Sequence, residues 1–344
     1  MLACFSVPVQ AYSGFSPYIR KQLRKGAKGG LPLKVVAKTV EADSITSFEL
    51  AHPRGKVLPA FSAGSHIDLT IAPGLTRQYS LCNDPKETHR YLVAVLREDE
   101  GRGGSVRMHE EVEEGDVLQA GGPRNHFPLA HGAEKTLLIA GGIGITPILC
   151  MAERLANIGA DFALHYCVRS LDQAAFADRI RGSSFAGRTH FHVSAERGRL
   201  NVTSLLRQQP PGTHVYVCGP NRLIDDVVET ARALGWDEGR IHREYFAAAH
   251  RDTANDKPFA LKIASSGLVI EVPKDRSVVE ALAAHGIDIP TSCGDGVCGT
   301  CLTRVLEGEV EHRDMLLSPE ERAKNDQFTP CCSRSAGQLL VLDL

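Results

Sequence analysis

Short apolar segments alternate with polar ones over the first third of the chain. From residue 31 to about residue 131, runs rich in Val, Ile, Leu and Thr are separated by Gly, Pro and Asp. Several short strands at near-regular spacing are typical of an antiparallel sandwich or barrel. The expected strands are LKVVAKTV, SITSFEL, SHIDLTI, RQYSL, RYLVAVLR and DVLQAGG.

The pattern changes after Glu134. The continuous apolar run KTLLIA predicts a buried strand, and PILCMAERLANIG after it has the apolar spacing of a helix. Strands that alternate with helices indicate a parallel α/β sheet. Further strands are expected at FALHYCV, HFHVSA and HVYVCG, and further helices at DQAAFADRI and NRLIDDVVETARALG.

The last part of the chain begins after a small, polar segment, residues 247–258, which has no apolar period and predicts a linker. FALKIASSGLVIEVP then predicts a hairpin that turns at Ser-Ser-Gly, and SVVEALAAHG predicts a short helix. Ser277 and Glu280 match a capping box, and Gly286 matches a helix stop. QLLVLDL predicts a closing strand.

Composition and charge narrow the class of protein. The chain has 344 residues, 43% hydrophobic and 23% charged, with a net charge of -2, which does not favour nucleic-acid binding. No apolar run approaches the roughly 18 residues of a membrane span. The N-terminus lacks the basic start of a signal peptide, so we expect a cytoplasmic protein.

Residues 1–30 have no periodic pattern, and we expect them to be an extension. Seven basic residues and no acidic one lie between Tyr18 and Lys38. This pattern favours a solvated arm, with a docking or membrane-surface patch as the alternative.

Ten cysteines need an explanation, and half of them crowd the C-terminal part. Cys293, Cys298 and Cys301 have the C-x4-C-x2-C spacing of plant-type [2Fe–2S] ferredoxins, and Cys331 follows after 29 residues. Gly294, Gly296 and Gly299 would allow the tight turns that such a loop requires. Structural zinc is the alternative, although zinc favours paired C-x2-C motifs.

Cys331 and Cys332 compete for the fourth position. If this segment is extended, neighbouring side chains point to opposite sides, and only one of them can be a ligand. We expect that ligand to be Cys331.

Two segments of the predicted barrel suggest a flavin. In RQYSL, Arg77 would hold a phosphate, Tyr79 would cover a flavin ring and Ser80 would donate a hydrogen bond to flavin N5, although these residues are common on strands. GRGGS (101–105) would nest a phosphate with its backbone N–H groups, or form a plain loop.

GGIGITP (141–147) follows a buried strand and precedes a helix, where backbone N–H groups favour a pyrophosphate. Thr146 would be the N-cap and Pro147 the first helical residue. The segment is not the Rossmann G-x-G-x-x-G. Cys218 ends a later strand, at the carboxyl edge where α/β sheets bind ligands, or is simply a small buried residue.

Taken together and in this order, RQYSL, GRGGS, GGIGITP, VCGP and C-x4-C-x2-C resemble the phthalate dioxygenase reductase family, which includes the vanillate O-demethylase reductases. The resemblance runs from about Leu33 to Leu344 and includes PRNHFPL (123–129). It implies three domains: an antiparallel FMN-binding β-barrel (31–131), a parallel α/β NAD-binding domain (132–247) and, after a linker (248–258), a plant-type ferredoxin of β-grasp fold (259–344).

The resemblance also implies residue roles. Arg77, Tyr79 and Ser80 would contact FMN, the strand from Val95 to Arg97 would line the ring edge, and Thr146 and Phe246 would lie against the flavin. The residues nearest to hydride transfer would be Ser80, Thr146 and Cys218. The flavin phosphate would meet Gly103, Gly104 and Ser105, and the nicotinamide site would contain Gly142, Gly144, Pro147, Cys218, Gly219 and Pro220. Cys331 matches the ligand in the family's Cys-x-Ser-Arg.

The implied function is a reductase that passes electrons from NADH through FMN to a [2Fe–2S] cluster and on to a Rieske-type terminal oxygenase. Arg169 and Ser170 would suit the 2′-phosphate of NADPH, a group that NADH lacks. The ferredoxin segment 258–344 has 13 acidic and 8 basic residues, which fits an acidic docking face or ordinary solubility. The alternatives are a reductase for another acceptor, such as a cytochrome P450, and a zinc-bound redox-sensing interaction protein.

Overall fold

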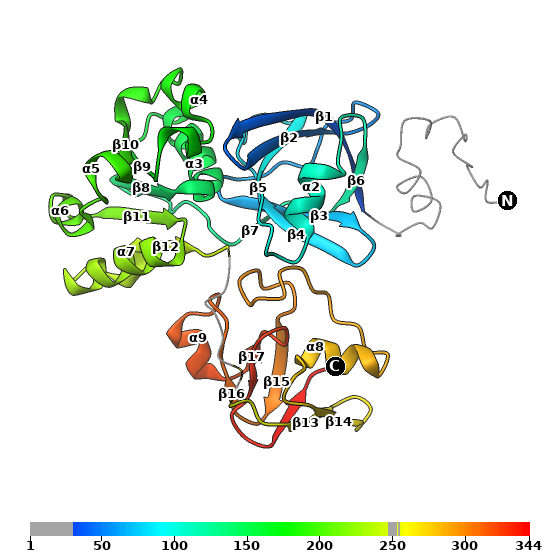
Figure 1. Ribbon diagram of the computed structural model, residues 1–344. Helices are drawn as coiled ribbons and strands as arrows, with labels where there is room; N and C mark the ends of the chain where they lie inside the picture. Colours follow the sequence, from blue (N-terminus) through cyan, green and yellow to red (C-terminus); the bar gives the residue numbers. More distant parts are fainter. Residues whose placement is uncertain (1–29, 247–252, 254) are drawn as a thin grey trace. The chain divides into compact units, whose positions relative to one another are not determined.

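The computed structural model describes residues 30–246, 253 and 255–344 (Figure 1). Residues 1–29 of the predicted N-terminal extension and most of the predicted linker lie outside the described residues. The chain divides into two compact units, one ending at Glu244 and one beginning at Tyr245. Within the described ranges, no helix is long and apolar enough to cross a membrane.

The first unit begins with a seven-stranded antiparallel sheet in the order β4-β3-β6-β1-β2-β5, with β7 paired to β3. Apolar side chains from the whole length of this order, including Leu33, Phe48, Ile67 and Val93, share one core. The sheet therefore closes around that core as the predicted barrel. Its strands are β1 (Leu31–Ala42), β2 (Ile45–Ala51), β3 (Ser65–Ala72), β4 (Leu75–Ser80), β5 (Arg90–Leu96), β6 (Val117–Ala120) and β7 (Arg124–Asn125).

A short helix, α2 (Gly104–Glu110), contacts β3, β4 and β5. The sequence suggested only a glycine-rich turn here. Gly103 supplies that turn with a φ of 74°, and the helix follows at once, burying Met108 in the barrel core.

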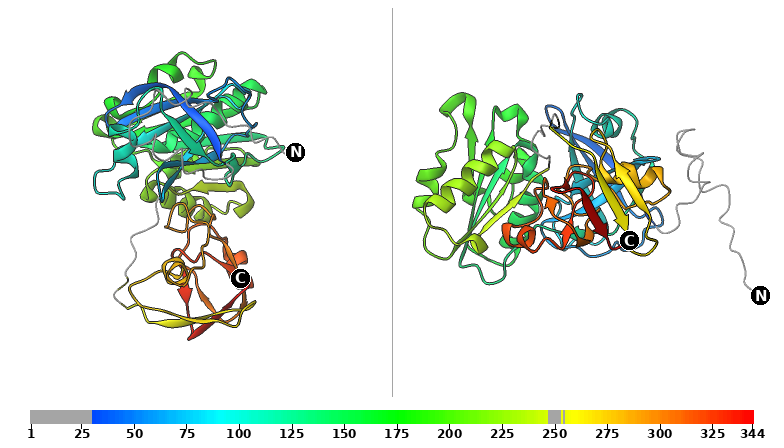
Figure 2. Two further views of the ribbon diagram at one scale, coloured as in Figure 1. Left: turned by 90° about the vertical axis from the view of Figure 1, so that its right-hand side faces the viewer. Right: turned by 90° about the horizontal axis from the view of Figure 1, so that it is seen from below.

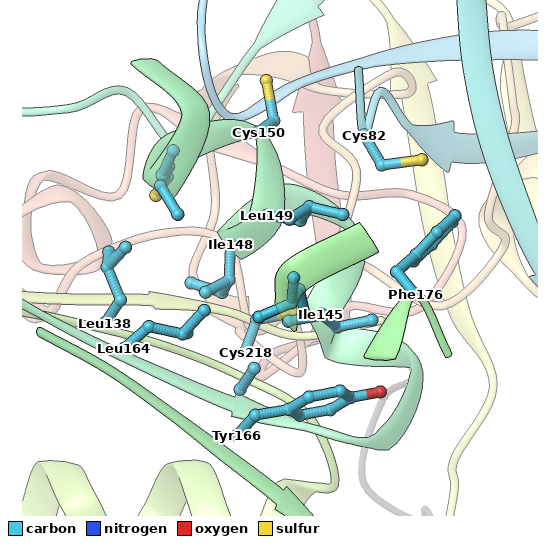
Figure 3. Packing of buried hydrophobic residues seen from close by; sticks show 14 of the residues in the cluster. Cys82, Leu138, Ile145, Ile148, Leu149, Cys150, Leu164, Tyr166, Phe176 and Cys218 are labelled. Carbon is cyan, nitrogen blue, oxygen red and sulfur yellow. The ribbon is translucent and has the colours of Figure 1, made fainter. Parts of the chain in front are cut away.

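The second half of this unit is a parallel five-stranded sheet in the order β10-β9-β8-β11-β12. Figure 1 shows α3 and α7 on opposite faces of it, and Figure 2 gives two further views. Ile145, Ile148 and Leu149 of α3 pack on Leu138 and Leu164 (Figure 3). The elements are β8 (Lys135–Gly141), α3 (Ile145–Asn157), β9 (Phe162–Val168), α4 (Ala177–Arg181), β10 (Thr189–Val193), α5 (Ser194–Arg197), α6 (Val202–Arg207), β11 (Thr213–Cys218), α7 (Asn221–Ala233) and β12 (Ile241–Glu244).

Two helix predictions in this region are corrected. The helix expected over residues 172–180 is split into a 3-10 turn, Leu171–Gln173, and α4, because Phe176 has a φ of 61° and cannot continue a helix. Helix α3 begins at Ile145 with Gly144 as N-cap, so Thr146 and Pro147 are inside its first turn. The reason is the 3-10 turn Gly142–Gly144, which runs directly into the helix.

The second unit contains a mixed sheet in the order β14-β13-β19-β15-β17, in which only β13 and β19 are parallel among the described pairs. The predicted hairpin, helix and closing strand are all present, and Ser277 and Glu280 form the predicted capping box. The elements are β13 (Phe259–Ile263), β14 (Val269–Val272), α8 (Val278–Ala284), β15 (Thr303–Glu307), β16 (Val310–Glu311), α9 (Pro319–Lys324), β17 (Gln327–Phe328), β18 (Arg334–Ser335) and β19 (Leu339–Leu342).

Asp256 ties the start of this unit to its interior. Arg313 donates two hydrogen bonds to the Asp256 carboxylate, at 2.7 and 3.0 Å. The guanidinium of Arg334 lies 3.6 Å from the same carboxylate and also donates to the backbone oxygens of Arg276, Lys257 and Pro273. The Arg313 interaction holds the pKa of Asp256 below its usual value.

Candidate functional site

Four cysteine thiols gather in the second unit. Cys293, Cys298 and Cys301 lie on the loop between α8 and β15, and Cys331 lies in the turn after β17. All four side chains are buried. Hydrogen bonds from the thiols of Cys298 and Cys331 to the Cys293 sulfur lower the pKa of Cys293, and Cys331 also bonds to Cys301. The C-x4-C-x2-C motif and the distant cysteine are therefore brought together.

The loop depends on its glycines. Gly294, Gly296 and Gly299 have φ values of 73°, 75° and 69°, which favour glycine. A Cβ on Gly296 would lie 2.4 Å from the Cys332 sulfur and 3.0 Å from the Asp314 Cα. The backbone N–H of Asp295 donates to the Cys293 sulfur at 3.3 Å. The tight loop thus points amide hydrogen toward sulfur, as a bound thiolate requires.

The segment around Cys331 is a turn and not an extended strand. The N–H groups of Cys332 and Ser333 both donate to the Thr329 oxygen, at 3.1 and 2.9 Å. In this turn Cys331 and Cys332 are both buried and their thiols are hydrogen-bonded to each other. The condition under which the two side chains would point to opposite sides, an extended segment, is therefore not met. Cys331 differs from its neighbour in also contacting Cys293 and Cys301.

These thiols fit a [2Fe–2S] cluster. Within the described residues, no three His, Cys, Asp or Glu side chains are placed to hold one metal ion. The thiols instead contact one another in a chain, from Cys298 to Cys293, from Cys293 to Cys331 and from Cys331 to Cys301. A two-iron cluster needs four thiolates shared between its irons, and the donor set here has that number and that chemistry.

Arg77 lies across the start of α2 in the first unit. Its guanidinium donates to the backbone oxygens of Thr76 and Arg102, at 2.9 and 3.1 Å. A Cβ on Gly104 would lie 2.8 Å from the Cγ and Nε atoms of Arg77, so glycine makes room for this side chain. The guanidinium and the first free N–H groups of α2 lie together, which suits a phosphate.

Tyr79 and Ser80 occupy the end of β4. Tyr79 is half-buried against the barrel core, and burial raises the pKa of its phenol. Ser80 is buried opposite His66 of β3. The His66 ring is stacked on that of His126 at 5.4 Å, and its buried Nε2 has no hydrogen-bond partner among the described residues. This edge of the barrel is therefore rich in polar groups that a flavin ring would contact.

Three other predicted flavin contacts have partners within the protein. The guanidinium of Arg97 donates to Asp99 and Glu110, both at 2.8 Å. The Ser105 hydroxyl accepts from the Glu98 N–H at 3.1 Å. Val95 is buried in the barrel core. Phe246 is exposed at the start of the second unit, so its packing on the flavin stays a prediction.

The glycine-rich segment after β8 meets the end of β11. A Cβ on Gly144 would lie 2.3 Å from the Cys218 backbone oxygen, and one on Gly219, whose φ is 155°, would lie 2.9 Å from Gly141. Pro220 lies against Gly141 in the same way. The Thr146 hydroxyl donates to the Ile143 oxygen at 3.0 Å. One edge of the sheet therefore holds all the residues predicted for the nicotinamide site, together with Thr146: Gly142, Gly144, Thr146, Pro147, Cys218, Gly219 and Pro220.

Glu244 is a residue of this edge that the sequence did not single out. It ends β12 directly beside Cys218 of β11. Its Oε2 is buried with no hydrogen-bond partner among the described residues, and burial raises the pKa of Glu244 to about 8. The buried carboxyl also helps to raise the pKa of the Cys218 thiol, after burial of the thiol itself. The strand IHRE is mostly polar, so the sequence carried no signal that distinguishes Glu244 from an ordinary surface acid.

A pocket of about 380 Å³ continues from this edge toward β9 and β10. It is lined at one end by Gly141, Gly142, Pro220 and Leu223 and at the other by Arg169, His192, Ser194 and Arg199. Ser170, which was paired with Arg169 in the sequence analysis, does not line it within the described part of the chain. The pocket thus extends the glycine-lined edge in the direction that a dinucleotide needs.

Comparison with known proteins bears on both units. The family model "2Fe-2S iron-sulfur cluster binding domain" matches residues 261–336. A second, "Dimethylamine monooxygenase subunit DmmA-like, N-terminal domain", matches residues 121–241. The vanillate O-demethylase oxidoreductase of Pseudomonas putida is 53% identical over 312 residues, covering 90% of this chain and 98% of that protein.

The chain belongs to the vanillate O-demethylase oxidoreductase and phthalate dioxygenase reductase family. Its structure is similar to phthalate dioxygenase reductase, described as modular for electron transfer from pyridine nucleotides to [2Fe-2S], with a TM-score of 0.72 and 38% identity over 92% of this chain and 98% of that one. An intact type IV self-sufficient cytochrome P450 monooxygenase is also similar, with a TM-score of 0.81 and 38% identity over 92% of this chain. This chain spans 41% of that P450.

Membership of this reductase family confirms several predictions. The chain is an oxidoreductase of the oxygenase-reductase type, with a flavin, nucleotide and ferredoxin architecture. FMN, NADH and the [2Fe–2S] cluster are the cofactors of the family.

Proposed function

We propose that this chain is the reductase component of a cytoplasmic Rieske-type oxygenase system and passes electrons from NADH to that oxygenase. The observation that carries the proposal is the presence in one chain of a glycine-lined strand edge and a cluster of four buried thiols, three on one loop and the fourth on a later turn. When bound, FMN accepts the two electrons of a hydride and releases them singly, and the [2Fe–2S] cluster accepts single electrons.

The nicotinamide site is assigned to the edge formed by β8, β11 and β12. The absence of side chains at Gly142, Gly144 and Gly219 lets a flat ring approach the backbone, and Pro220 lies beside Gly141 at the same edge. Cys218 packs at the bottom of this site. The Glu244 carboxyl, protonated below its raised pKa, has a hydrogen atom to donate to the carboxamide of a nicotinamide and would orient the ring.

The FMN site is assigned to residues 31–131, with the nucleotide at 132–247 and the cluster at 259–344. Arg77 and the backbone of Gly103, Gly104 and Ser105 would bind the flavin phosphate. Tyr79, Ser80, the Val95–Arg97 backbone, Thr146 and Phe246 would face the ring. Because Arg97 and Ser105 already have side-chain partners, we expect their backbone atoms to make these contacts.

The cluster ligands are assigned to Cys293, Cys298, Cys301 and Cys331. The loop glycines allow N–H groups to reach sulfur, which stabilises thiolates, and burial keeps water from them. The chain's own residues hold the nicotinamide, the flavin and the cluster in place. No general acid or base is needed for hydride transfer.

A second acceptor is favoured by one observation, the similarity to the reductase part of a P450 chain. The test is to give the NADH-reduced protein, under argon, equal amounts of an oxidised Rieske-type oxygenase or a cytochrome P450 and to follow each acceptor's spectrum. We expect rapid reduction of the Rieske centre and slow reduction of the P450. Preferential P450 reduction would contradict the proposed partner, and acid extraction of FAD in place of FMN would contradict the proposed flavin.

A further inference from the structure

Three arginines line the nucleotide pocket. Arg169, Arg199 and Arg222 have exposed side chains, and none of them makes a salt bridge with any residue that the structure describes. Most other arginines nearby are paired, as Arg179 is with Glu153 and Arg232 with Glu238. Unpaired cations around a pocket are a feature of anion binding.

The position of each arginine shows which part of a dinucleotide it would meet. The glycine-lined end of the pocket lies at β8 and β11, where a pyrophosphate and nicotinamide would lie. Arg222 is in the first turn of α7, next to that end. Arg169 directly follows β9, and Arg199 follows α5 beyond β10. The sheet order β10-β9-β8-β11 therefore places these two at the opposite end, where the adenosine would lie.

The residue after the second strand of such a sheet often decides the nucleotide. In dinucleotide folds an acidic residue there bonds the ribose 2′-hydroxyl of NAD, whereas an arginine accommodates the 2′-phosphate of NADP. Here the position after β9 is Arg169. The next acidic residue, Asp172, does not line the pocket in the described part of the chain. Asp226 does line it, from α7, one turn after Arg222 and thus at the β11 side.

We propose that the adenosine end of this pocket binds a 2′-phosphate through Arg169 and Arg199, with the Ser194 hydroxyl beside them, so that the reductase uses NADPH as well as NADH. The proposal rests on the nicotinamide site proposed above and adds the identity of its nucleotide. A guanidinium pair gives bidentate contacts to a dianionic phosphate. An unphosphorylated ribose leaves both arginines solvated, which costs little, so NADH is not excluded.

The test uses the full chain with its cofactors and two measurements. Titration calorimetry compares 2′,5′-ADP with 5′-AMP, which requires no electron transfer. Steady-state cytochrome c reduction compares kcat/KM for NADPH and NADH. Because charged hydrogen bonds to phosphate are strong, we expect 2′,5′-ADP to bind at least about tenfold more tightly than 5′-AMP, with a steep loss at high salt.

Variants assign the effect to residues. Arg169→Ala and Arg199→Ala should each lower the NADPH to NADH ratio of kcat/KM roughly tenfold. Arg222→Ala should weaken both nucleotides and leave the ratio within about twofold. Arg207→Ala removes an exposed arginine of α6 that does not line the pocket, and should leave the ratio unchanged. Circular dichroism checks the fold of each variant.

The outcomes separate this inference from the proposed function. Equal or weaker binding of 2′,5′-ADP, or an NADPH to NADH ratio below about one-hundredth with NADH fully active, would overturn the inference and leave the reductase intact. A properly folded, flavin-containing protein that oxidises neither nucleotide would contradict the proposed function itself.

Discussion

The cluster loop and the nicotinamide site are built in opposite ways. Three of the four predicted cluster ligands lie within residues 293–301 of the second unit, and local turns place them together. In the first unit, Gly144, Cys218 and Glu244 come from three separate strand ends that only the parallel sheet brings together. A site made by one loop is visible in residue spacing, whereas a site made by topology appears only when strand order is known.

The difference also predicts how the sites fail. A single ligand of the loop is irreplaceable, because every thiol is needed for the cluster. The nicotinamide site is formed jointly by several strand ends, so the loss of one side chain should only weaken function. A substitution that forces apart the closely packed backbones at Gly144 and Cys218 should instead damage the fold. The predictions that follow test this contrast.

The largest effect is expected for Cys298→Ser. The cluster should be lost, seen as missing iron and missing [2Fe–2S] absorbance, because the loop has no further thiol at that place. Flavin reduction by NADH should persist, since the nicotinamide site and all the proposed flavin contacts except Phe246 lie in the other unit. Normal cluster absorbance together with normal cytochrome c reduction would show that Cys298 is not a ligand.

Two matched glycine substitutions should each destabilise a different unit of the protein. Gly144→Ala puts a Cβ 2.3 Å from the Cys218 oxygen, and Gly296→Ala puts one 2.4 Å from the Cys332 sulfur at a φ of 75°. We expect each to destabilise its own unit by about 1–3 kcal/mol. Differential scanning calorimetry and cofactor content would reveal this; loss of the cluster in Gly144→Ala with flavin binding unaffected would contradict the separation.

Glu244→Ala should slow hydride transfer by about tenfold in stopped-flow measurements at pH 7, because one hydrogen bond to the nicotinamide is lost. Glu244→Gln retains a donor and should stay close to the native rate. In the native protein the rate should fall as pH rises through about 8, the raised pKa of this carboxyl. A pH profile that is the same in the Gln variant would exclude Glu244 as its cause.

The same carboxyl gives a stability prediction with a definite sign. Its pKa is higher in the folded than in the unfolded state, so the folded state is favoured most at low pH and loses that advantage as pH rises from about 4.5 to about 8. The Tm of the first unit should decline less over this interval in Glu244→Gln. An equal decline in both proteins would contradict the burial of this group.

The smallest effect is expected for the ion pairs of the second unit. Asp256→Asn should lower the free energy of unfolding of the second unit by about 1–2 kcal/mol. The reason is that the guanidinium groups of Arg313 and Arg334 lose the buried carboxylate with which they interact. Since the pKa of Asp256 is lowered, this contribution is present at neutral pH and lost in acid. Asp343→Asn, in the exposed pair with Arg304, is the control and should change stability by less than about 1 kcal/mol.

Much of the fold follows from pattern. The buried strand β8, the alternating strands of the barrel and the capping box at Ser277 depend on local sequence, and all are present. The elements that were wrong depend on tertiary contacts. Phe176 breaks a helix because its φ is 61°, with its side chain buried in the α/β core, and a 3-10 turn starts α3 earlier than the cap signals indicated.

The candidate site shows the same division. The four cysteines were found from spacing, but the turn that places Cys332 beside Cys331 depends on hydrogen bonds to Thr329. Glu244 was missed because an acid at the end of a strand is ordinary until β12 is known to lie beside β11. The resemblance to the reductase family supplied the proposed flavin contacts, for which pattern alone left a plain strand or loop as the alternative.

In the proposed function, one chain carries electrons from a nicotinamide nucleotide to the cluster held by Cys293, Cys298, Cys301 and Cys331. The most direct test is a visible absorbance spectrum of protein purified without air, before and after addition of NADH. The account predicts both flavin and [2Fe–2S] bands, each of which bleaches with NADH. A colourless protein that contains zinc, or a cluster that stays oxidised while the flavin is reduced, would contradict it.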